Sequence, residues 1–399
     1  MSFRFSPHRR TGLAAVAVAV LAGVATAAPA VADSPAPLRL TLPHPSGDQA
    51  IGTHSMHLVD ESRTDPWTSE GPRELMVSVT YPARKTGGLT RAPHMLPGAA
   101  ADFDKHSAPD SLGINPGIID WAGTRAHSWQ GAPVKGSGKR PVLVFSSGFA
   151  LPRAFGTVLV EELASRGYVV VSVDHTYEAG QVEFPDGRVE RTKAKQDDME
   201  DIVKSFDTRV ADMKFVLDTI TDLGEGKNPD RGGRAIPEGL SGALDTSRIG
   251  MLGFSLGGAA AGQVALDDKR VDAGVDLDGM FFGTVAKKGL AKPFLIMGAD
   301  TESDATWKEF RKNHRGWNRE LRLTGATHGS FSDFQALFPQ IARKLGLNVP
   351  DAVGTVDPKR SIAAQGTYVG AFFDLHLKNK PTRLFDGPSR KYPEVRHIR

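Results

Sequence analysis

The sequence of 399 residues contains no cysteine. This absence excludes disulfides, thiolate metal sites, a cysteine nucleophile and a lipidated N-terminal cysteine, so stability must come from an ordinary hydrophobic core. An excess of basic charge is also absent from most of the chain. The formal net charge is +3, and residues 1–32 carry three arginines and no acidic residue, so residues 33–399 are formally neutral. We therefore expect no nucleic-acid partner.

The first 32 residues have the features of a secretory signal peptide. Basic residues come first, residues 12–25 are apolar, and Ala30-Val31-Ala32 is a small-residue cleavage site. We expect the protein to be secreted after cleavage behind Ala32. The apolar stretch is shorter than the roughly 20 residues that a membrane-spanning helix needs. The pair Arg9-Arg10 leaves both the twin-arginine route and the general secretory route open.

Residues 33–399 are predicted to form one catalytic domain with a lid-like insertion around residues 83–139, where glycine, proline, alanine and histidine occur with little periodicity. Elsewhere buried strands alternate with helices, which is typical of an α/β fold with a mostly parallel central sheet and helices on both faces. Strands are predicted at residues 38–42, 74–81, 141–145, 168–173, 248–252, 273–277, 293–297 and 320–323. Helices are predicted at residues 154–165, 197–223, 259–265, 334–345 and 361–377.

The sequence Gly253-Phe254-Ser255-Leu256-Gly257-Gly258 lies between a predicted strand and an alanine-rich predicted helix. A G-x-S-x-G pattern in this setting is typical of a nucleophile elbow, a sharp strand-to-helix turn that presents its serine. The flanking glycines permit the strained backbone and the close packing of helix against strand. We therefore predict that Ser255 is a nucleophile.

A serine hydroxyl needs an imidazole to take its proton and a carboxylate to orient that imidazole. In a fold with this elbow the order along the chain is serine, acid, histidine. Among the histidines that follow Ser255, His328 lies in a glycine-containing loop directly after the last predicted strand, from which a base reaches back to the elbow. We predict that His328 is the general base.

The acid has several candidates. Asp276 and Asp278 end the strand that follows the elbow, whereas Asp300, Glu302 and Asp304 follow the next strand. Because side chains alternate along a strand, Asp278, just past the strand end, is best placed to project from the carboxyl edge of the sheet. The residues alone leave the others open, and helix caps and turns are the common alternative roles for these carboxylates.

Attack on an ester creates an oxyanion that two preorganised backbone N–H groups stabilise. One belongs to the residue after the nucleophile and the other to a loop after an early strand. These rules predict Leu256 and Phe149, because Gly148 lets the backbone turn after the strand at 141–145. His175, at another strand end, either lines the pocket or is a buried structural histidine. We expect no metal ion or cofactor in this chemistry.

With these residues in place, the chain resembles the platelet-activating factor acetylhydrolase family of plasma or intracellular type II, within the α/β-hydrolases. The resemblance covers most of residues 33–399 and is carried by residues 58–67, 73–77, 81–83, 145–148, 209–218 and 247–250. It implies an α/β-hydrolase fold and phospholipid substrates with short or oxidised acyl chains. In that family the acid follows the strand directly after the elbow, so the resemblance favours Asp278.

Two positions depart from the family pattern. Ser147 stands where the family usually carries histidine in the oxyanion loop, and Phe254 stands where histidine is common in the elbow. Neither position supplies the donor N–H, so we expect catalysis to persist with altered pocket polarity and acyl preference. A weaker resemblance, to secreted bacterial cutinases and polyester hydrolases, rests on Gly298-Ala299-Asp300 and would make Glu302 the acid.

The sequence thus predicts a secreted, metal-independent serine esterase that cleaves short-chain or phospholipid acyl esters through an acyl-enzyme. Its expected partner is a small-molecule or lipid ester, with transient contact to a lipid surface. A lipase or cutinase-like polyester hydrolase is the alternative activity. A non-catalytic binding module with the same fold is the alternative from another class, because fold does not determine function. The oligomeric state stays open.

Overall fold

A computed structural model describes residues 36–84, 87–302 and 304–398. The predicted signal peptide, residues 1–32, lies outside the described residues. The strands in the described ranges are β1 (Ile51–Thr64), β2 (Pro72–Pro82), β3 (Arg91–Pro93), β4 (Arg125–Gln130), β5 (Arg140–Ser146), β6 (Val169–His175), β7 (Gln181–Glu183), β8 (Val189–Arg191), β9 (Leu244–Phe254), β10 (Val271–Leu277), β11 (Phe294–Gly298), β12 (Asn318–Leu323) and β13 (Val395–His397).

The α-helices in the same ranges are α1 (Pro97–Asp102), α2 (Thr157–Ser165), α3 (Met199–Gly224), α4 (Leu240–Ala243), α5 (Leu256–Asp267), α6 (Val285–Lys288), α7 (Ala305–Asn313), α8 (Phe334–Leu345), α9 (Val349–Val353) and α10 (Pro358–Leu377). A π-helix, η1 (Phe103–Leu112), and two 3-10 helices, η2 (Arg153–Gly156) and η3 (His328–Phe331), complete the helical segments. None of the helices within the described ranges is both long enough and apolar enough to cross a membrane.

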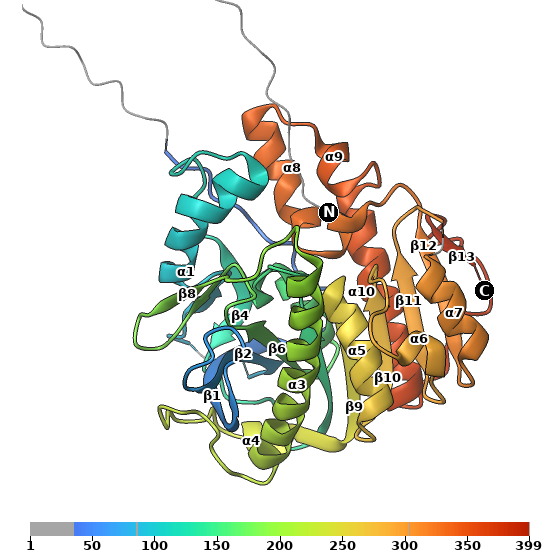
Figure 1. Cartoon of the computed structure of the whole chain (residues 1–399), viewed down its shortest axis with the longest axis horizontal. Helices are drawn as coiled ribbons and strands as arrows, with labels where there is room; N and C mark the ends of the chain where they lie inside the picture. The colour runs from blue at the N-terminus through green and yellow to red at the C-terminus, as the bar shows by residue number, and fades with distance from the viewer. Residues whose placement is uncertain (1–35, 85–86, 303, 399) are drawn as a thin grey trace, which may run out of the picture.

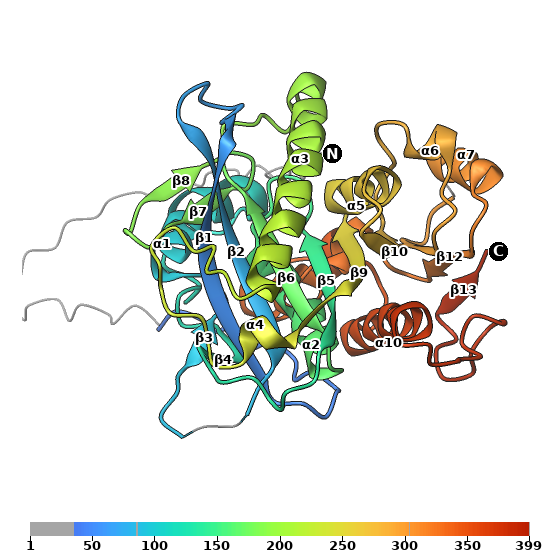
Figure 2. The same ribbon diagram turned by 90° about the horizontal axis from the view of Figure 1, so that it is seen from below.

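One sheet organises the described part of the molecule. Its strand order is β13-β12-β11-β10-β9-β5-β6-β2-β1-β4-β3, and β7 and β8 form a separate pair. The strands β5, β6 and β9 to β12 run parallel, whereas β2 is antiparallel to both of its neighbours. Helices α3 and α5 lie on one face and α2 and α10 on the other (Figures 1 and 2). The predicted mostly parallel sheet with helices on both faces is therefore confirmed.

The direction of winding reverses next to β5. The chain passes from β5 to β6 on one side and later returns to place β9 on the other side of β5. Beside such a reversal, the carboxyl ends of parallel strands leave a crevice where α/β proteins bind ligands. The loops after β5, β9, β10 and β12 hold the predicted site residues, so the topology brings them to one edge of the sheet.

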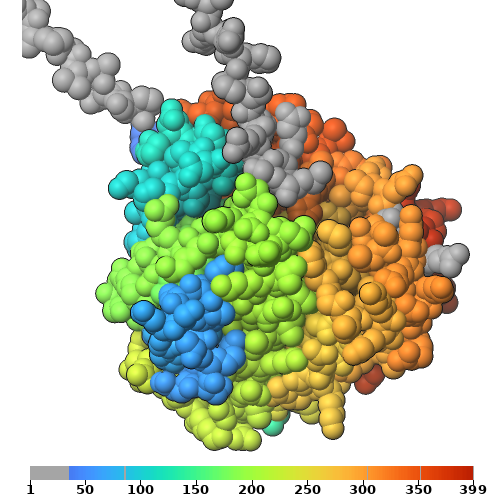
Figure 3. Space-filling view, in the orientation of Figure 1, coloured from blue at the N-terminus to red at the C-terminus, as the bar shows by residue number. Residues whose placement is uncertain are grey.

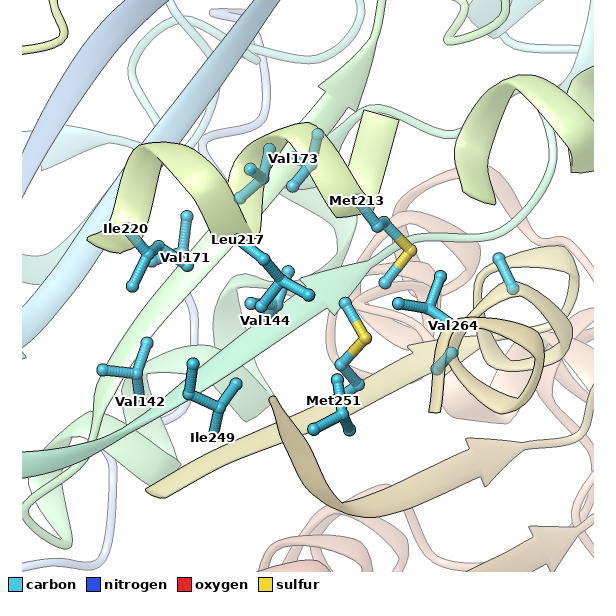
Figure 4. Close-up of a cluster of buried hydrophobic side chains, with 14 of the residues drawn as sticks. Val142, Val144, Val171, Val173, Met213, Leu217, Ile220, Ile249, Met251 and Val264 are labelled. Carbon is cyan, nitrogen blue, oxygen red and sulfur yellow. The ribbon is translucent and has the colours of Figure 1, made fainter. Parts of the chain in front are cut away.

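The central strands are buried on both faces. Runs such as Val142 to Phe145 in β5 and Val169 to Val171 in β6 are almost continuously apolar, as parallel strands between two helical layers require. Figure 4 shows Met213, Leu217 and Ile220 of α3 packed over the valines of these strands. This packing accounts for the helical spacing of apolar residues that predicts a helix at 197–223.

One predicted strand is wrong. Residues 38–42 form no strand; Leu38 makes only an isolated bridge to Ile119, while Leu40 and Leu42 are buried in a side cluster of hydrophobic residues. The sheet begins instead with β1, whose sequence mixes histidine, serine and aspartate with apolar residues. Because β1 is only half buried, its pattern lacks the apolar run that marks the central strands.

Residues 83–139, which the sequence predicts as a lid-like insertion, also contribute to the sheet. β4 pairs in parallel with β1, and β3 pairs antiparallel with β4, so this segment extends the sheet beyond β1. The rings of Phe103 in η1 and Phe155 in η2 lie 5.4 Å apart and join the segment to the domain core. Figure 3 shows the residues around α1, in teal, at the molecular surface.

A buried hydrogen-bonded pair of side chains connects this segment to the loop that carries His328. The Asp333 carboxylate lies 3.0 Å from His94 Nε2 and accepts a hydrogen bond of 3.0 Å from the Val158 N–H. Both side chains of the pair are almost fully buried. Asp333 therefore joins the 83–139 segment, α2 and the start of α8, close to the predicted general base.

Asp333→Ala should lower the free energy of unfolding by about 2–4 kcal/mol, because it leaves the Val158 N–H and the His94 ring buried without their acceptor. Urea unfolding followed by far-UV circular dichroism measures this change. The control is Asp110→Ala, the same substitution at an exposed position of the same segment. Equal urea midpoints for both variants would show that the buried pair contributes nothing to stability.

Candidate active site

Ser255 lies at a strained turn between β9 and α5. Its backbone angles are φ 56° and ψ −124°, a region that residues with a side chain rarely occupy. The turn is held because Ser255 N–H donates a 2.8 Å hydrogen bond to the Leu277 carbonyl at the end of β10. A Cβ on Gly253 would clash with the backbone of Gly257, and one on Gly257 would clash with the Ser146 carbonyl oxygen. The glycines of the G-x-S-x-G pattern are therefore required by close backbone packing.

His328 and Asp278 are aligned with Ser255. His328 Nε2 lies 3.0 Å from Ser255 Oγ, and His328 Nδ1 lies 2.7 Å from Asp278 Oδ2. These distances allow the imidazole to exchange a proton with the hydroxyl while the carboxylate holds the other ring nitrogen. The His328 side chain is 44% exposed, so a substrate can reach it.

The loop that carries His328 is held at both ends. The 3-10 helix η3 begins at His328, and Thr327 and Ser330 cap it reciprocally through backbone and side chain. The Ser330 hydroxyl also donates a 2.8 Å hydrogen bond to the Val353 carbonyl. The ring of Phe254, one of the two departures from the family pattern, packs 4.7 Å from the His328 ring. An apolar ring thus lies beside the imidazole.

Asp278 is fixed by the neighbouring strand. Its backbone has φ 57°, its N–H donates 2.9 Å to the Met297 carbonyl, and its Oδ1 accepts 2.7 Å from the Ala299 N–H. The carboxylate oxygen that faces His328 is thereby oriented. Among the acid candidates, the structure brings Asp278 to the imidazole.

The acids after β11 have other surroundings. Asp300 accepts hydrogen bonds from Gly325 N–H and the Arg396 guanidinium, and Asp304 caps α7 by accepting from Thr306 N–H. Glu302 is exposed. The alternative that would make Glu302 the partner of the histidine has no contact to support it in the described residues.

Asp276 is buried beneath the elbow. Its Oδ1 accepts a 2.9 Å hydrogen bond from Gly279 N–H, and a Cβ on Gly258 would clash with that oxygen. Burial, and then the nearby charge of Asp278, raise the pKa of Asp276 well above its ordinary value. Both effects favour the neutral carboxyl over the carboxylate, and the side chain packs against the turn without a contact to His328.

The predicted oxyanion donors follow two neighbouring strands, since Phe149 lies in the loop after β5 and Leu256 is the first residue of α5, directly after β9 and Ser255. The N–H groups of Phe149 and Leu256 have no hydrogen-bond acceptor among the described residues. A Cβ on Gly148 would lie 2.9 Å from the Phe254 ring, so the loop after β5 packs directly against the elbow. The Ser147 hydroxyl, the other departure from the family pattern, donates 2.5 Å to the Leu151 carbonyl and closes this loop. Two N–H groups without a protein acceptor, on segments that pack together at the elbow, meet the first requirement for binding an oxyanion.

His175 is a buried structural histidine and does not line the pocket. It is 1% exposed, and both ring nitrogens have partners, Ser146 and Asp212. Arg209, which is absent from the predicted site, reaches the same loop and donates 3.0 Å to the Gly148 carbonyl. Helical spacing places Arg209 on the apolar face of α3, and this was the signal of a buried partner.

A separate cavity of about 440 Å³ lies between β1, β2, β6 and the 83–139 segment. Polar side chains line part of it, among them Ser78, Arg153, Glu161 and Asp174. None of the five predicted site residues is part of its lining. In the described ranges, no group of three or more histidines and acids is arranged to hold a metal ion.

Known proteins are similar to this chain in sequence. The family model for "Platelet-activating factor acetylhydrolase, isoform II" matches residues 121–385. A "Probable 1-alkyl-2-acetylglycerophosphocholine esterase" from Arthroderma benhamiae is 30% identical over 412 residues, covering 90% of this chain and 94% of that protein. A platelet-activating factor acetylhydrolase from Cavia porcellus is 25% identical over 221 residues, covering 51% of this chain and 50% of that protein.

A solved structure is similar over nearly the same extent. The ferulic acid esterase from Streptomyces cinnamoneus superposes with a TM-score of 0.74 and 35% sequence identity. The match covers 90% of this chain and 99% of that structure. Sequence and fold therefore agree on ester hydrolysis.

The variants Asp276→Asn and Asp278→Asn should have different effects on kcat and so distinguish the roles of the two neighbouring carboxyls. Asp278→Asn should lower kcat by about 10³-fold or more, because the amide cannot hold the imidazole in the required tautomer. Asp276→Asn should keep kcat within about tenfold, since burial favours the neutral carboxyl, which the amide resembles, and Asp276 does not contact His328. Steady-state hydrolysis of p-nitrophenyl acetate measures both.

The pH dependence of stability gives the second readout for Asp276. Its pKa is raised in the folded state, so the wild type loses stability as pH rises from about 4, the unfolded pKa, through the folded pKa. The asparagine does not titrate, so Asp276→Asn should become progressively more stable relative to wild type over that range. A constant difference in unfolding free energy across pH would contradict a neutral Asp276.

Proposed function

Because this chain belongs to the platelet-activating factor acetylhydrolase isoform II family and is a carboxylic ester hydrolase, we propose that it works through Ser255, His328 and Asp278. The observation that carries this proposal is a pair of hydrogen bonds at a strained elbow: one of 3.0 Å joins Ser255 to His328, and one of 2.7 Å joins His328 to Asp278. The non-catalytic binding module is disfavoured by the family.

The chemistry follows from the geometry. Ser255 Oγ attacks the ester carbonyl carbon while His328 Nε2 takes the hydroxyl proton, and Asp278 stabilises the imidazolium. The carbonyl oxygen becomes an oxyanion between the Phe149 and Leu256 N–H groups. The intermediate collapses, the alcohol leaves with the proton from His328, and the acyl group stays on Ser255. Water then attacks the acyl-enzyme by the same steps and releases the acid.

The substrate class that we propose is an acyl ester with a short acyl chain, including acetyl esters of phospholipids. The name of the Arthroderma relative, a probable esterase of 1-alkyl-2-acetylglycerophosphocholine, supports this choice. A second candidate is an ester of an aromatic acid, since the solved structure with 35% identity is a ferulic acid esterase. The apolar ring of Phe254 beside His328 fits either acyl group.

Transient contact with a lipid surface is part of the proposal. Met199 and Val203 of α3 are 61% and 43% exposed, and Met280 in the loop after β10 is 50% exposed. One turn further along α3, Phe206 packs 5.6 Å from Phe282 of the same loop. The exposed apolar side chains thus lie on both sides of the contact between Phe206 and Phe282, near the proposed acid. Exposed apolar patches of this kind favour apolar ligands.

Ser255→Ala should lower kcat by at least about 10³-fold, because the members of a triad act as one unit. The measurement is hydrolysis of p-nitrophenyl esters from acetate to palmitate, of a 1-alkyl-2-acetyl phosphocholine and of ethyl ferulate. Ser247→Ala, an exposed serine at the other end of β9, is the control.

The substrate profile decides between the candidates. A maximum at short acyl chains supports the acetylhydrolase-like activity, a maximum on the ferulate ester supports the aromatic candidate, and a maximum at long chains supports a lipase. Full activity of Ser255→Ala would refute the mechanism. If folded wild type hydrolyses no ester, the non-catalytic binding module becomes the favoured hypothesis.

We also propose that the protein is secreted. Expression of the full chain in a bacterial host should release a product into the medium that begins at Asp33, as N-terminal sequencing measures. Ala30→Asp should block cleavage, because the site requires small residues. Replacing Arg9 and Arg10 with lysines stops export only on the twin-arginine route. An intact N-terminus retained in the cytoplasm would contradict secretion.

A further inference from the structure

A second Ser–His–Asp row lies inside the protein. Ser146 Oγ is 2.9 Å from His175 Nε2, and His175 Nδ1 is 2.9 Å from Asp212 Oδ2. None of the three residues is more than 1% exposed. The row has almost the spacing of the exposed site, but no ester reaches it, so its role must differ.

The direction of each hydrogen bond in this row follows from charge. Burial, and then the nearby Arg209, lower the pKa of His175, so the imidazole is neutral and has one N–H. Burial opposes the ionisation of Asp212, but Arg73 and the bond from His175 hold its pKa far below the ordinary value. His175 Nδ1–H therefore donates to the carboxylate, and Nε2 accepts the Ser146 hydroxyl proton.

Arg209 connects this row to the loop after β5. Its Nη1 donates to Ser146 Oγ at 2.8 Å and also to the Ser147 carbonyl. Its Nη2 donates to the Gly148 carbonyl at 3.0 Å. One fully buried guanidinium thus binds the last residue of β5 and the first two residues of the loop that continues to Phe149.

Glu178 holds the other side of Phe149. Its Oε2 accepts 2.8 Å from Arg209 Nε, and its Oε1 accepts 2.8 Å from Ala150 N–H. Ala150 has φ 60°, a strained conformation that this bond helps to maintain. The backbone on both sides of Phe149 is therefore bound to one buried ion pair.

The Gly148 carbonyl and the Phe149 N–H belong to the same peptide unit. The unit is planar and trans, so the two groups point in opposite directions. By binding the carbonyl, Arg209 sets the direction of the N–H. The positive charge of the Arg209 guanidinium beside the carbonyl oxygen also polarises the peptide and makes the N–H a stronger donor.

We call Ser146, His175, Glu178, Arg209 and Asp212 the buried frame. Arg209 and Glu178 bind the loop directly, and the row of Ser146, His175 and Asp212 is joined to Arg209 through the Ser146 hydroxyl. We propose that the buried frame positions the Phe149 N–H for the oxyanion and thereby sets the rate of acylation. The inference rests on the proposed function, because it needs Phe149 as an oxyanion donor. The frame residues are positioning residues, since none of them touches the substrate.

Two variants test the buried frame, and they remove different numbers of its hydrogen bonds. Arg209→Lys keeps the positive charge beside Glu178 but removes the fork that binds the carbonyls. Ser146→Ala removes only the hydroxyl that joins His175 to Arg209. The matched control is Ser205→Ala, because Ser205 is equally buried and its hydroxyl has no partner among the described residues.

The readout compares p-nitrophenyl acetate with its thiono counterpart, in which sulfur replaces the carbonyl oxygen. Sulfur is larger and a weaker acceptor, so donors placed for oxygen favour the oxygen ester. Arg209→Lys should lower kcat on the oxygen ester by about 100-fold with KM within about threefold, and Ser146→Ala by about tenfold. Both should reduce the ratio of oxygen-ester to thiono-ester rates, whereas Ser205→Ala should change neither quantity.

Each outcome decides the inference. Equal losses on both esters, or full kcat in a folded frame variant, would overturn it. If Arg209→Lys does not fold, Ser146→Ala carries the test alone. Failure of the proposed function is separate, because wild type would then hydrolyse no ester and an organophosphate would not label Ser255. If wild type hydrolyses esters and Ser146→Ala leaves the ratio of oxygen-ester to thiono-ester rates unchanged, only the inference about the buried frame is overturned.

Discussion

Four neighbouring strands end at the same edge of the sheet, and the loop after each strand contains a non-glycine residue with a positive φ. These residues are Tyr177 after β6, Ala150 after β5, Ser255 after β9 and Asp278 after β10, with φ between 56° and 65°. Such conformations cost about 1–3 kcal/mol each and persist only where the surroundings over-determine them. Here Ser255 N–H binds the end of β10, and Asp278 N–H binds the end of β11. A hydrogen bond to the neighbouring strand thus stabilises each of these two strained residues. The positions of the other site residues depend on these hydrogen bonds at the edge of the sheet.

Buried charge on α3 adds a second constraint. Arg209 and Asp212 lie on the face of α3 that packs against the sheet, among Phe206, Met213 and other apolar residues. A charge in such surroundings costs several kcal/mol unless it is paired and hydrogen-bonded. Both charges have their partners only when α3 sits in one register against β5 and β6. The apolar contacts of α3 tolerate small shifts, whereas these polar contacts do not. The packing of one helix and the geometry of the loop after β5 are therefore linked.

Local patterns predicted much of this fold. The valine-rich strands, the periodicity of α3 and the G-x-S-x-G turn are properties of short segments, and the structure has each of them. Half-buried β1 was missed, and the apolar residues 38–42 were wrongly predicted as a strand, because burial outside the sheet produces the same run of apolar residues. Alternation placed Asp278 first among the acids, but only the fold shows that Glu302 is exposed. The pairing of Arg209 with Glu178 joins residues 31 apart in sequence, which no local pattern encodes.

The two Ser–His–Asp rows show that residue type and spacing do not make a catalytic site. The proposed base His328 is 44% exposed at its side chain, so water and substrate can surround the imidazolium that forms during attack. His175 is almost fully buried beside Arg209, and both features disfavour a second positive charge on its ring. A histidine whose protonated form is disfavoured is a poorer general base. It can still hold a hydroxyl in one orientation, because a neutral imidazole with a fixed tautomer is a rigid acceptor. Solvent access therefore separates the two roles: the exposed row can move protons, and the buried row keeps the backbone beside it in place.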